Sequence, residues 1–197
     1  FFSKMLEAQT DIGGRRLVGK ANGTMQVAIL AGGLATRLGC LTKNQPKSMI
    51  RVMGEPFLAY QLELIRRGGL RNVILCIGHL GDKIRRHFRH GEKYGLNIQY
   101  SVEDRVLGTA GALKLAEPLL DDTFFTIYGD SYIFVDFSLI RQYFDAQNRL
   151  ALMAVYKNCY NNDASNTVVE GNLVKKFSNK EETEDMVFIE YGANVFR

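Results

Sequence analysis

The chain is poor in cysteine and proline and has no tryptophan. Of its 197 residues, three are Cys and three are Pro. The cysteines are far apart, at positions 40, 76 and 159, and no two of them form a CxxC pair. Neither a disulfide framework nor a cysteine-based zinc site is therefore indicated. Free thiols are typical of a reducing compartment, and we expect a cytoplasmic protein.

Long apolar runs and a large excess of charge are missing as well. No stretch approaches the roughly 20 apolar residues that a membrane-spanning helix needs, so we expect no membrane partner. The net charge is only +4, whereas proteins that bind nucleic acid through a broad surface are usually more basic. Segment 83–93 is basic, with five Lys or Arg and two His, but a solvated helix face explains it without nucleic acid.

What is present is the composition of a globular domain. Hydrophobic residues make up 46% of the chain and charged residues 23%, which suits one domain with a sizeable core. Residues 1–24 show little periodicity, and we expect a leader, a linker or the tail of a preceding domain there. The domain itself is expected over 25–197. Because the chain stops directly after the apolar run Tyr191–Phe196, we expect this domain to be incomplete at its C-terminus.

From Met25 onward, short apolar runs alternate with amphipathic segments. The former predict buried strands, and apolar residues three and four apart predict helices. The expected strands are 27–30, 73–77, 96–102, 123–128, 150–156 and 187–196, with a hairpin of 167–170 and 173–177. The expected helices begin at Glu55-Pro56, after a cap at Asp82, at Thr109 and at Ser138. This alternation predicts an α/β fold with a Rossmann-like open, mixed and mostly parallel sheet, flanked by helices, with a late antiparallel hairpin.

Segment 27–49 carries the strongest functional signal. The apolar run Val27–Leu30 is followed by Gly32-Gly33, and Arg37 and Lys47 bring positive charge. In an open α/β sheet, ligands bind at the carboxyl ends of strands, and glycines expose backbone N–H donors. We therefore predict a polyphosphate cradle, although a glycine-rich turn with two solvated cations also explains these residues. Neither GxGxxG nor GxxxxGK[ST] follows this strand.

The segment AGGLATRLGCLTKNQPKSM resembles the signature of the sugar-phosphate nucleotidylyltransferases. These enzymes join a nucleoside triphosphate to a sugar 1-phosphate and release pyrophosphate. Their pattern is Gly-Gly-x-Gly-Thr-Arg-Leu followed by Thr and Pro-Lys, and this chain has Ala35 where many members have Gly. The resemblance implies a glycosyltransferase-A-like fold, these two substrates and Mg²⁺ as cofactor. It leaves open whether the protein is a homo-oligomer.

Two further segments resemble the base-reading and metal-binding parts of the family. In YSVEDRVLGTAGA, Glu103 would accept hydrogen bonds from the base edge and Gly108 would let the base approach the backbone. A carboxylate only accepts hydrogen bonds, which suits the adjacent N–H donors of guanine. Glu103 and LGTAGA most resemble the guanylyl branch of the family, which implies GTP and a mannose- or heptose-type sugar, with UTP or dTTP as the alternative. In IYGD, Asp130 would be an oxygen ligand of Mg²⁺, and Tyr128 stands where the family has Asn.

The resemblance also implies a sugar side. FSNK is similar to the family's Phe-x-Glu-Lys, with Lys180 on the sugar phosphate and Asn179 in place of Glu, while Lys176 competes for the role of Lys180. Glu190 and Gly192 match a strand beside the sugar pocket. A regulatory subunit that senses a nucleotide sugar without turnover is a further alternative.

The predicted site thus has three groups of residues. Catalysis is assigned to Arg37, Lys47 and Asp130, the last as metal ligand. Nucleotide binding is assigned to Leu30, Ala31, Gly32, Gly33, Thr36, Arg37, Lys47, Glu103, Gly108 and Thr109. Sugar binding is assigned to Gly129, Asn179, Lys180, Glu190 and Gly192.

Overall fold

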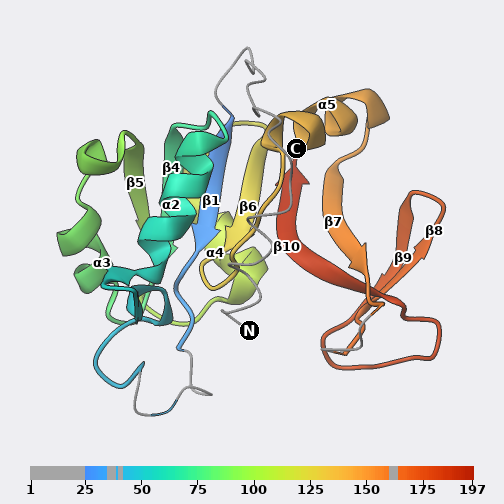
Figure 1. Cartoon of the computed structure of the whole chain (residues 1–197), viewed down its shortest axis with the longest axis horizontal. Coiled ribbons are helices and arrows are strands. Elements are labelled where there is room, and N and C mark those ends of the chain that lie inside the picture. The colour runs from blue at the N-terminus through green and yellow to red at the C-terminus, as the bar shows by residue number, and fades with distance from the viewer. Residues whose placement is uncertain (1–24, 35–38, 40–41, 160–163) are drawn as a thin grey trace.

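The computed structural model describes residues 25–34, 39, 42–159 and 164–197 of the chain. Thr36 and Arg37 lie outside these residues. An eight-stranded sheet dominates the described part, in the order β5-β4-β1-β6-β10-β8-β9, with β7 paired to β10 (Figure 1). The sheet consists of β1 (Gln26–Leu30), β4 (Asn72–Ile77), β5 (Asn97–Val102), β6 (Phe124–Tyr128), β7 (Ala151–Lys157), β8 (Thr167–Glu170), β9 (Leu173–Phe177) and β10 (Phe188–Phe196). A small ribbon of β2 (Arg51–Val52) and β3 (Glu55–Pro56) precedes the helix that starts at Phe57.

The first four sheet strands are parallel. β1 pairs with β4 on one side and with β6 on the other, and β5 extends the sheet beyond β4. The side chains of Val27, Ala28 and Ile29 are fully buried, as expected for a central strand covered on both faces. The mostly parallel sheet that the sequence predicts is therefore confirmed.

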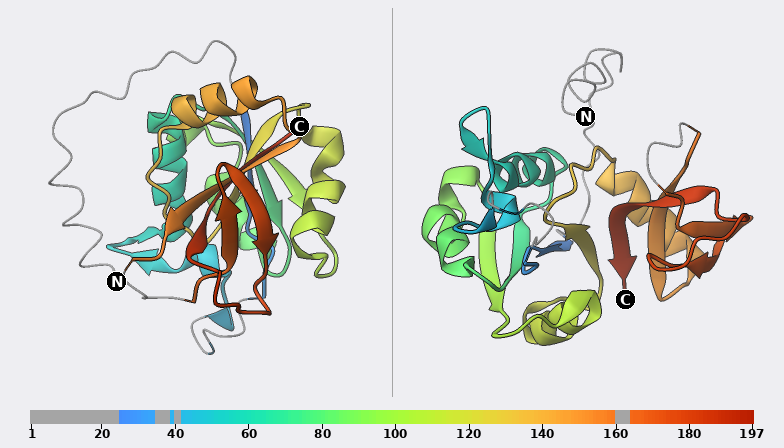
Figure 2. Two further views of the ribbon diagram at one scale, coloured as in Figure 1. Left: turned by 90° about the vertical axis from the view of Figure 1, so that its right-hand side faces the viewer. Right: turned by 90° about the horizontal axis from the view of Figure 1, so that it is seen from below.

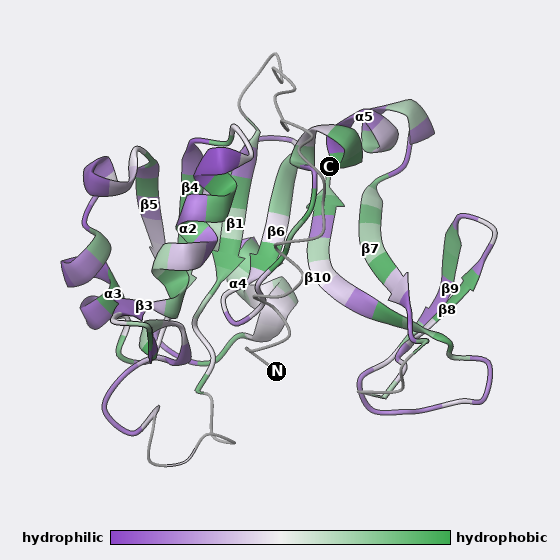
Figure 3. Cartoon of the chain, viewed as in Figure 1, coloured by the Kyte–Doolittle hydropathy of each residue, from purple (hydrophilic) through white to green (hydrophobic). Residues whose placement is uncertain are grey.

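Helices cover both faces of this sheet (Figure 2). On one face, α2 (Phe57–Arg67), α3 (Gly81–Phe88) and α5 (Phe137–Gln147) contribute Leu62, Phe88 and Phe144 to the larger core. On the other face, Ala116 of α4 (Gly108–Ala116) packs against Ile74 in a smaller cluster. Short 3₁₀ turns stand at Lys47–Met49, Glu92–Tyr94 and Glu117–Leu119. Figure 3 shows apolar residues along β1 and β6 and a largely hydrophilic α3.

Two predicted helix starts are wrong. Asp82 does not cap α3, because the turn from Gly78 lets the helix begin at Gly81, with Leu80 as N-cap at φ 58°. Asp82 instead lies in the first turn, where its charge suits the helix dipole. Likewise Pro56 belongs to β3 and precedes α2, because Arg51 pairs with it across the ribbon.

The antiparallel part of the sheet is built around β10. This strand pairs with β6, β7 and β8, and β8 forms a hairpin with β9. The register of β10 against β7 shifts between Glu190 and Asn194, and Gly192 within this irregularity has φ 84°. Figure 1 shows β10 bending so that the hairpin stands away from the parallel strands. This confirms the late antiparallel hairpin.

The strand order determines where a ligand can reach the sheet. The chain moves outward from β1 through β4 to β5 and then returns to the opposite side of β1 as β6. The carboxyl ends of β1 and β6 therefore flank a topological switch point, where open α/β sheets bind ligands. Within the described residues, no helix has the length and apolar character to cross a bilayer.

Candidate active site

A cavity of about 300 Å³ opens at this switch point. It lies at the carboxyl ends of β1, β4 and β6 and at the first residues of α4. Most of the residues predicted to bind the nucleotide line this cavity, and so does the Gly129-Asp130 turn. These lining residues are Leu30, Ala31, Gly32, Gly33, Lys47, Glu103, Gly108, Thr109, Gly129 and Asp130. Residues separated by a hundred positions in sequence are thus gathered around one space.

Glu103 lies at the cavity, where a backbone N–H group binds its carboxylate and two glycines leave room for it. It directly follows β5, and its N–H donates to the carbonyl of Ile77 at 2.9 Å. Its Oε2 accepts a hydrogen bond from the N–H of Leu107 at 3.2 Å. A Cβ atom on Gly32 would lie 2.5 Å from Glu103 Oε1, and one on Gly78 would lie 2.8 Å from its Cγ. Both positions therefore need glycine for the carboxylate to take this place, and the sequence analysis overlooked Gly78.

The start of α4 forms one wall. Leu107 is its N-cap and makes no side-chain capping bond, and Gly108 and Thr109, the first two residues of this nine-residue helix, line the cavity. Such a helix start favours anions. Gly108 has φ 72°, a conformation that side chains disfavour, and a Cβ atom there would meet no atom within 4 Å. The glycine therefore meets a backbone requirement and leaves open space beside it.

Lys47 and Asp130 both line the cavity and form an ion pair. The Nζ atom of Lys47 donates to Asp130 Oδ2 at 2.6 Å, and each side chain is 43% exposed. Lys47 begins a 3₁₀ turn after Pro46, and Asp130 follows β6. Each charge is thus neutralised by the other, and both side chains remain accessible to a ligand.

Gln61 fixes the turn that carries Asp130. This buried side chain of α2 donates from Nε2 to the carbonyl of Tyr128 at 2.8 Å and to that of Ser131 at 2.6 Å. The two bonds bracket Gly129-Asp130. Sequence reasoning missed Gln61 because a single polar residue in an amphipathic helix carries no signal of its partner.

Ser48 and Cys76 also line the cavity. Ser48 Oγ is buried and has no hydrogen-bond partner among the described residues, so it can serve a ligand. Burial, with the nearby charge of Glu103, raises the pKa of the Cys76 thiol to about 12. The thiol therefore stays protonated at neutral pH and is not a nucleophile.

Tyr128 connects the cavity to the predicted sugar side. Its hydroxyl donates to Glu190 Oε2 at 3.3 Å, and Asn194 Nδ2 donates to Glu190 Oε1 at 2.8 Å. Burial, followed by the charges of Glu190 and Asp130, raises the pKa of Tyr128 to about 12, so the hydroxyl remains a donor. A Cβ atom on Gly192 would lie 3.3 Å from the Tyr128 ring. Glu190 and Gly192 thus lie directly behind the cavity wall.

Asn179 and Lys180 lie further away, in the loop after β9. Asn179 Oδ1 accepts from Asn166 Nδ2 at 3.0 Å, and Asn166 Oδ1 accepts from the N–H of Glu190 at 2.9 Å. Asn179 is therefore linked to Glu190 through one residue. Lys180 is not among the residues that line the cavity, and the competing Lys176 contacts Glu181 at 3.4 Å. The role predicted for Lys180 stays a prediction.

A magnesium ion prefers oxygen ligands, and Asp130 is the cavity residue predicted to supply one. Within the part of the chain that the structure describes, no group of three or more His, Cys, Asp or Glu could hold a metal. Asp130 offers one carboxylate, with Oδ2 on Lys47 and Oδ1 left for a further contact. Mg²⁺ commonly binds one or two carboxylates together with substrate phosphates and water. The residues therefore fit a magnesium ion that shares its coordination with a polyphosphate.

Comparison with curated proteins gives relatives of several substrate types. The chain is 31% identical over 156 residues to a D-glycero-alpha-D-manno-heptose 1-phosphate guanylyltransferase of Campylobacter jejuni, covering 79% of this chain and 69% of that protein. It is 36% identical over 124 residues to a UTP–glucose-1-phosphate uridylyltransferase of Synechocystis, covering 57% of this chain and 32% of that protein. The chain thus spans about a third of the length of the Synechocystis protein that it matches.

Solved structures share the fold. The crystal structure of HddC from Yersinia pseudotuberculosis complexed with GMP-PN superimposes with a TM-score of 0.73 at 23% identity, covering 87% of this chain and 76% of that one. The profile of the family described as "Nucleotidyl transferase" matches residues 26–195, which include β1 and nearly all of β10. The chain belongs to the nucleotidyl transferase family.

Proposed function

We propose that this chain transfers a nucleotidyl group from a nucleoside triphosphate to a sugar 1-phosphate in a reducing, cytoplasmic compartment. The observation that carries the proposal is the cavity at the β1–β6 switch point, where Lys47, Glu103 and Asp130 meet beside two glycines. A cation for phosphates, an acceptor for a base and a carboxylate for a metal are the groups that this reaction uses. Family membership supports the same reaction class.

The transfer is an in-line displacement at the α-phosphorus. A phosphate oxygen of the sugar 1-phosphate forms a new bond to this phosphorus, while the bond to the bridging oxygen of the β-phosphate breaks. The electron pair of that bond leaves with pyrophosphate. Because a sugar phosphate is already anionic near pH 7, no residue has to remove a proton. The protein contributes alignment and charge neutralisation.

Lys47 is the cation for this step. It stands at 2.6 Å from Asp130, and its exposure allows it to turn toward a triphosphate. The N–H groups at the start of α4 add partial positive charge. Arg37, predicted from the sequence, would join Lys47 on the phosphates. A magnesium ion held by Asp130 would neutralise phosphate oxygens further.

GTP is the proposed nucleotide. The N–H of Leu107 occupies one lone pair of the Glu103 carboxylate, and the remaining lone pairs can accept from adjacent donors of guanine. Uracil and thymine offer one such donor, so they make a weaker match. Relatives named as guanylyltransferases support GTP, whereas those named as uridylyl- and thymidylyltransferases support the alternative of UTP or dTTP.

A mannose- or heptose-type 1-phosphate is the proposed acceptor. It would lie on the Tyr128 side of the cavity, near Glu190 and Gly192. Asn179 and Lys180 would reach it only through movement of the loop after β9. The name of the Campylobacter relative supports a heptose.

A matrix of substrates tests the proposal. Pyrophosphate release is measured with Mg²⁺ for GTP, UTP and dTTP, each with mannose, heptose and glucose 1-phosphate. We expect the highest kcat/KM for GTP with mannose or heptose 1-phosphate. Higher values for UTP or dTTP would move the specificity to the alternative. No release with any pair, while GTP still binds, would show a sensing role instead of catalysis.

A further inference from the structure

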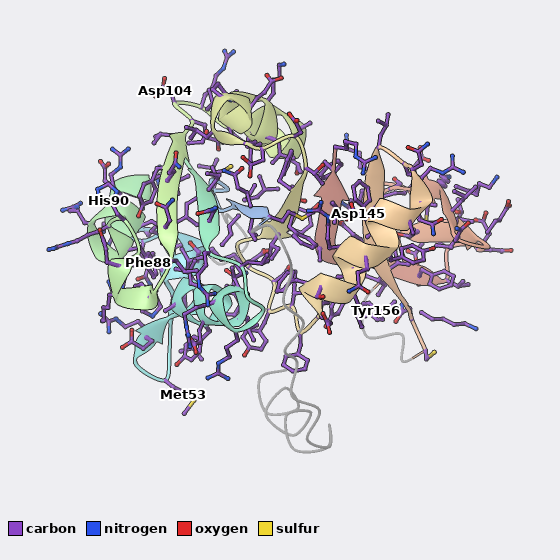
Figure 4. All side chains as sticks on the ribbon, turned by 90° about the horizontal axis from the view of Figure 1, so that it is seen from above. Met53, Phe88, His90, Asp104, Asp145 and Tyr156 are labelled. Atoms are coloured by element: carbon purple, nitrogen blue, oxygen red, sulfur yellow. The ribbon has the colours of Figure 1, made fainter. Side chains whose placement is uncertain are left out.

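A second recess lies along the free edge of β5, away from the cavity. It has a volume of about 750 Å³ and is lined on one side by the end of α3 and on the other by β5 and the tip of the Glu117–Leu119 turn. The lining residues are Arg85, Arg86, Arg89, His90, Ile98, Gln99, Tyr100 and Leu119. None of them lines the cavity. Figure 4 shows His90 at the outer margin of the molecule, at the end opposite Tyr156.

The charge of this recess is one-sided. Three guanidinium groups line it, and no Asp or Glu does; the acids nearest in the chain are Glu92, Glu117 and Asp121, each two positions from a lining residue. Among the described residues, these three arginines form no ion pair. Arg85 and Arg86 lie in the last turn of α3 and Arg89 follows its last residue, so three like charges fall within five positions. Positive charge is thus concentrated in a concave surface without an internal counter-charge.

The recess is also built by specific contacts. The guanidinium of Arg85 lies over the ring of Tyr100, 5.3 Å from its centroid. The hydroxyl of Tyr100 donates to the carbonyl of Arg89 at 2.5 Å. Arg89 has φ 48°, a left-handed conformation that a side chain adopts at a cost. One tyrosine of the edge strand therefore contacts the side chain of Arg85 and the backbone of Arg89.

These features match the recognition of phosphate groups. A guanidinium presents a planar fork of donors that suits phosphate oxygens, and three of them exceed what one phosphate needs. The volume falls in the range of small-molecule sites, about 300–1,000 Å³. Arg85 and Arg86 lie in the last turn of α3 and Arg89 caps its end, so the three guanidinium groups come from one five-residue stretch and can serve neighbouring phosphates of one molecule.

We propose that this recess is a second ligand site, which binds a small anion with two or more linked phosphate groups. Arg85, Arg86 and Arg89 contact the phosphates, and Tyr100 holds the arginines in position. The ligand is either a free polyphosphate or the phosphate tail of a nucleotide. The site is independent of the proposed function, because no residue of the cavity takes part in it.

Tripolyphosphate binding to the full chain tests this site. The Lys47→Ala variant serves as background, because it weakens binding in the cavity. Tripolyphosphate is titrated while affinity is measured by calorimetry and the amide signals of α3 and β5 are followed by NMR. We expect one equivalent to bind with shifts in these two elements. Adding Arg85→Gln and Arg89→Gln should weaken binding by about tenfold or more, since two charge-assisted contacts are lost.

Matched variants separate the recess from general charge. Arg149→Gln with Lys157→Gln removes the same charge from exposed positions outside the recess and should leave the affinity within about twofold. Arg86→Gln alone leaves the Tyr100 contacts intact and should still weaken binding if the first variant fails to fold. Equal affinity for tripolyphosphate and GTP would identify the phosphates as the whole ligand, and tighter GTP binding would identify a nucleotide. The proposal is overturned if the Arg85/Arg89 variant binds like the matched control, or if only single-stranded RNA binds through these arginines.

Discussion

At the scale of single residues, the cavity depends on a few charges in fixed positions. Lys47 is the described cation closest to Asp130, and nothing in the fold requires it, because an exposed ion pair contributes at most about 1 kcal/mol to stability. Its role should therefore be separable from folding.

Lys47→Ala should lower kcat by about a hundred- to a thousandfold, as expected when one donor to developing charge is removed. The melting temperature should stay near that of the wild type. Pyrophosphate release and a thermal melt check both statements. Lys114→Ala is the control, because it breaks another exposed ion pair, with Glu117, outside the cavity. A near-normal rate for Lys47→Ala would contradict the phosphate role.

Glu103→Gln should change nucleotide preference. The amide keeps the shape of the side chain but replaces one acceptor by a donor, so guanine loses a partner. We expect the ratio of kcat/KM for GTP over UTP to fall by about tenfold or more. Glu117→Gln, on an exposed turn, should leave this ratio unchanged. An unchanged ratio in Glu103→Gln would mean that another group reads the base.

At the scale of elements, α2 positions a turn of the sheet that lies far from it in sequence. Gln61 donates to two carbonyls around Asp130, and Leu58, Leu62 and Ile65 bury the same helix in the core. The helix thus combines packing with placement of Asp130, the residue proposed to hold a metal.

Gln61→Met should loosen the Asp130 turn. The side chain keeps its length but gives up its bonds to two part-buried carbonyls, of which that of Tyr128 still accepts from the N–H of Ser131, at a cost of about 1–2 kcal/mol. We expect a lower kcat and a higher Mg²⁺ concentration at half-maximal rate. Ile65→Val is the control, since it destabilises α2 by about 1 kcal/mol without touching the turn. If both variants respond alike to Mg²⁺, Gln61 has only a structural role.

The same elements show what a sequence can predict. Strands such as Val73–Ile77 and the glycine turn after β1 are local patterns; the structure confirms the strand, and Gly32 and Gly33 of the turn line the cavity. The prediction that Asp82 caps α3 was wrong, because a turn in which the N–H of Gly81 bonds to the carbonyl of Gly78 lets the helix begin earlier, at Gly81. Gln61 was not found because its partners stand 67 and 70 positions away, and the sequence of a helix does not show what it faces.

At the scale of the whole molecule, Tyr128 joins the two halves of the sheet. It ends β6, the last parallel strand, lines the cavity and donates to Glu190 of the antiparallel β10. Glu190 is linked in turn to the loop after β9 through Asn166. A hydrogen-bonded path therefore leads from the cavity to Glu190 and Asn179, two of the five residues assigned to the sugar side.

Tyr128→Phe tests this connection, because it keeps the ring on the cavity wall and removes only the hydroxyl. Glu190 then loses one donor, and its carboxylate is less firmly held. We expect the KM for the sugar 1-phosphate to rise by about three- to tenfold, which corresponds to about 1 kcal/mol, the net contribution of one hydrogen bond, while the KM for GTP stays constant. Tyr143→Phe removes a hydroxyl on α5 and serves as control. A rise in both KM values would place Tyr128 on the nucleotide side, whereas no change in either would leave Glu190 without a part in sugar recognition. The split between the two constants thus decides whether the antiparallel half of the sheet takes part in choosing the sugar.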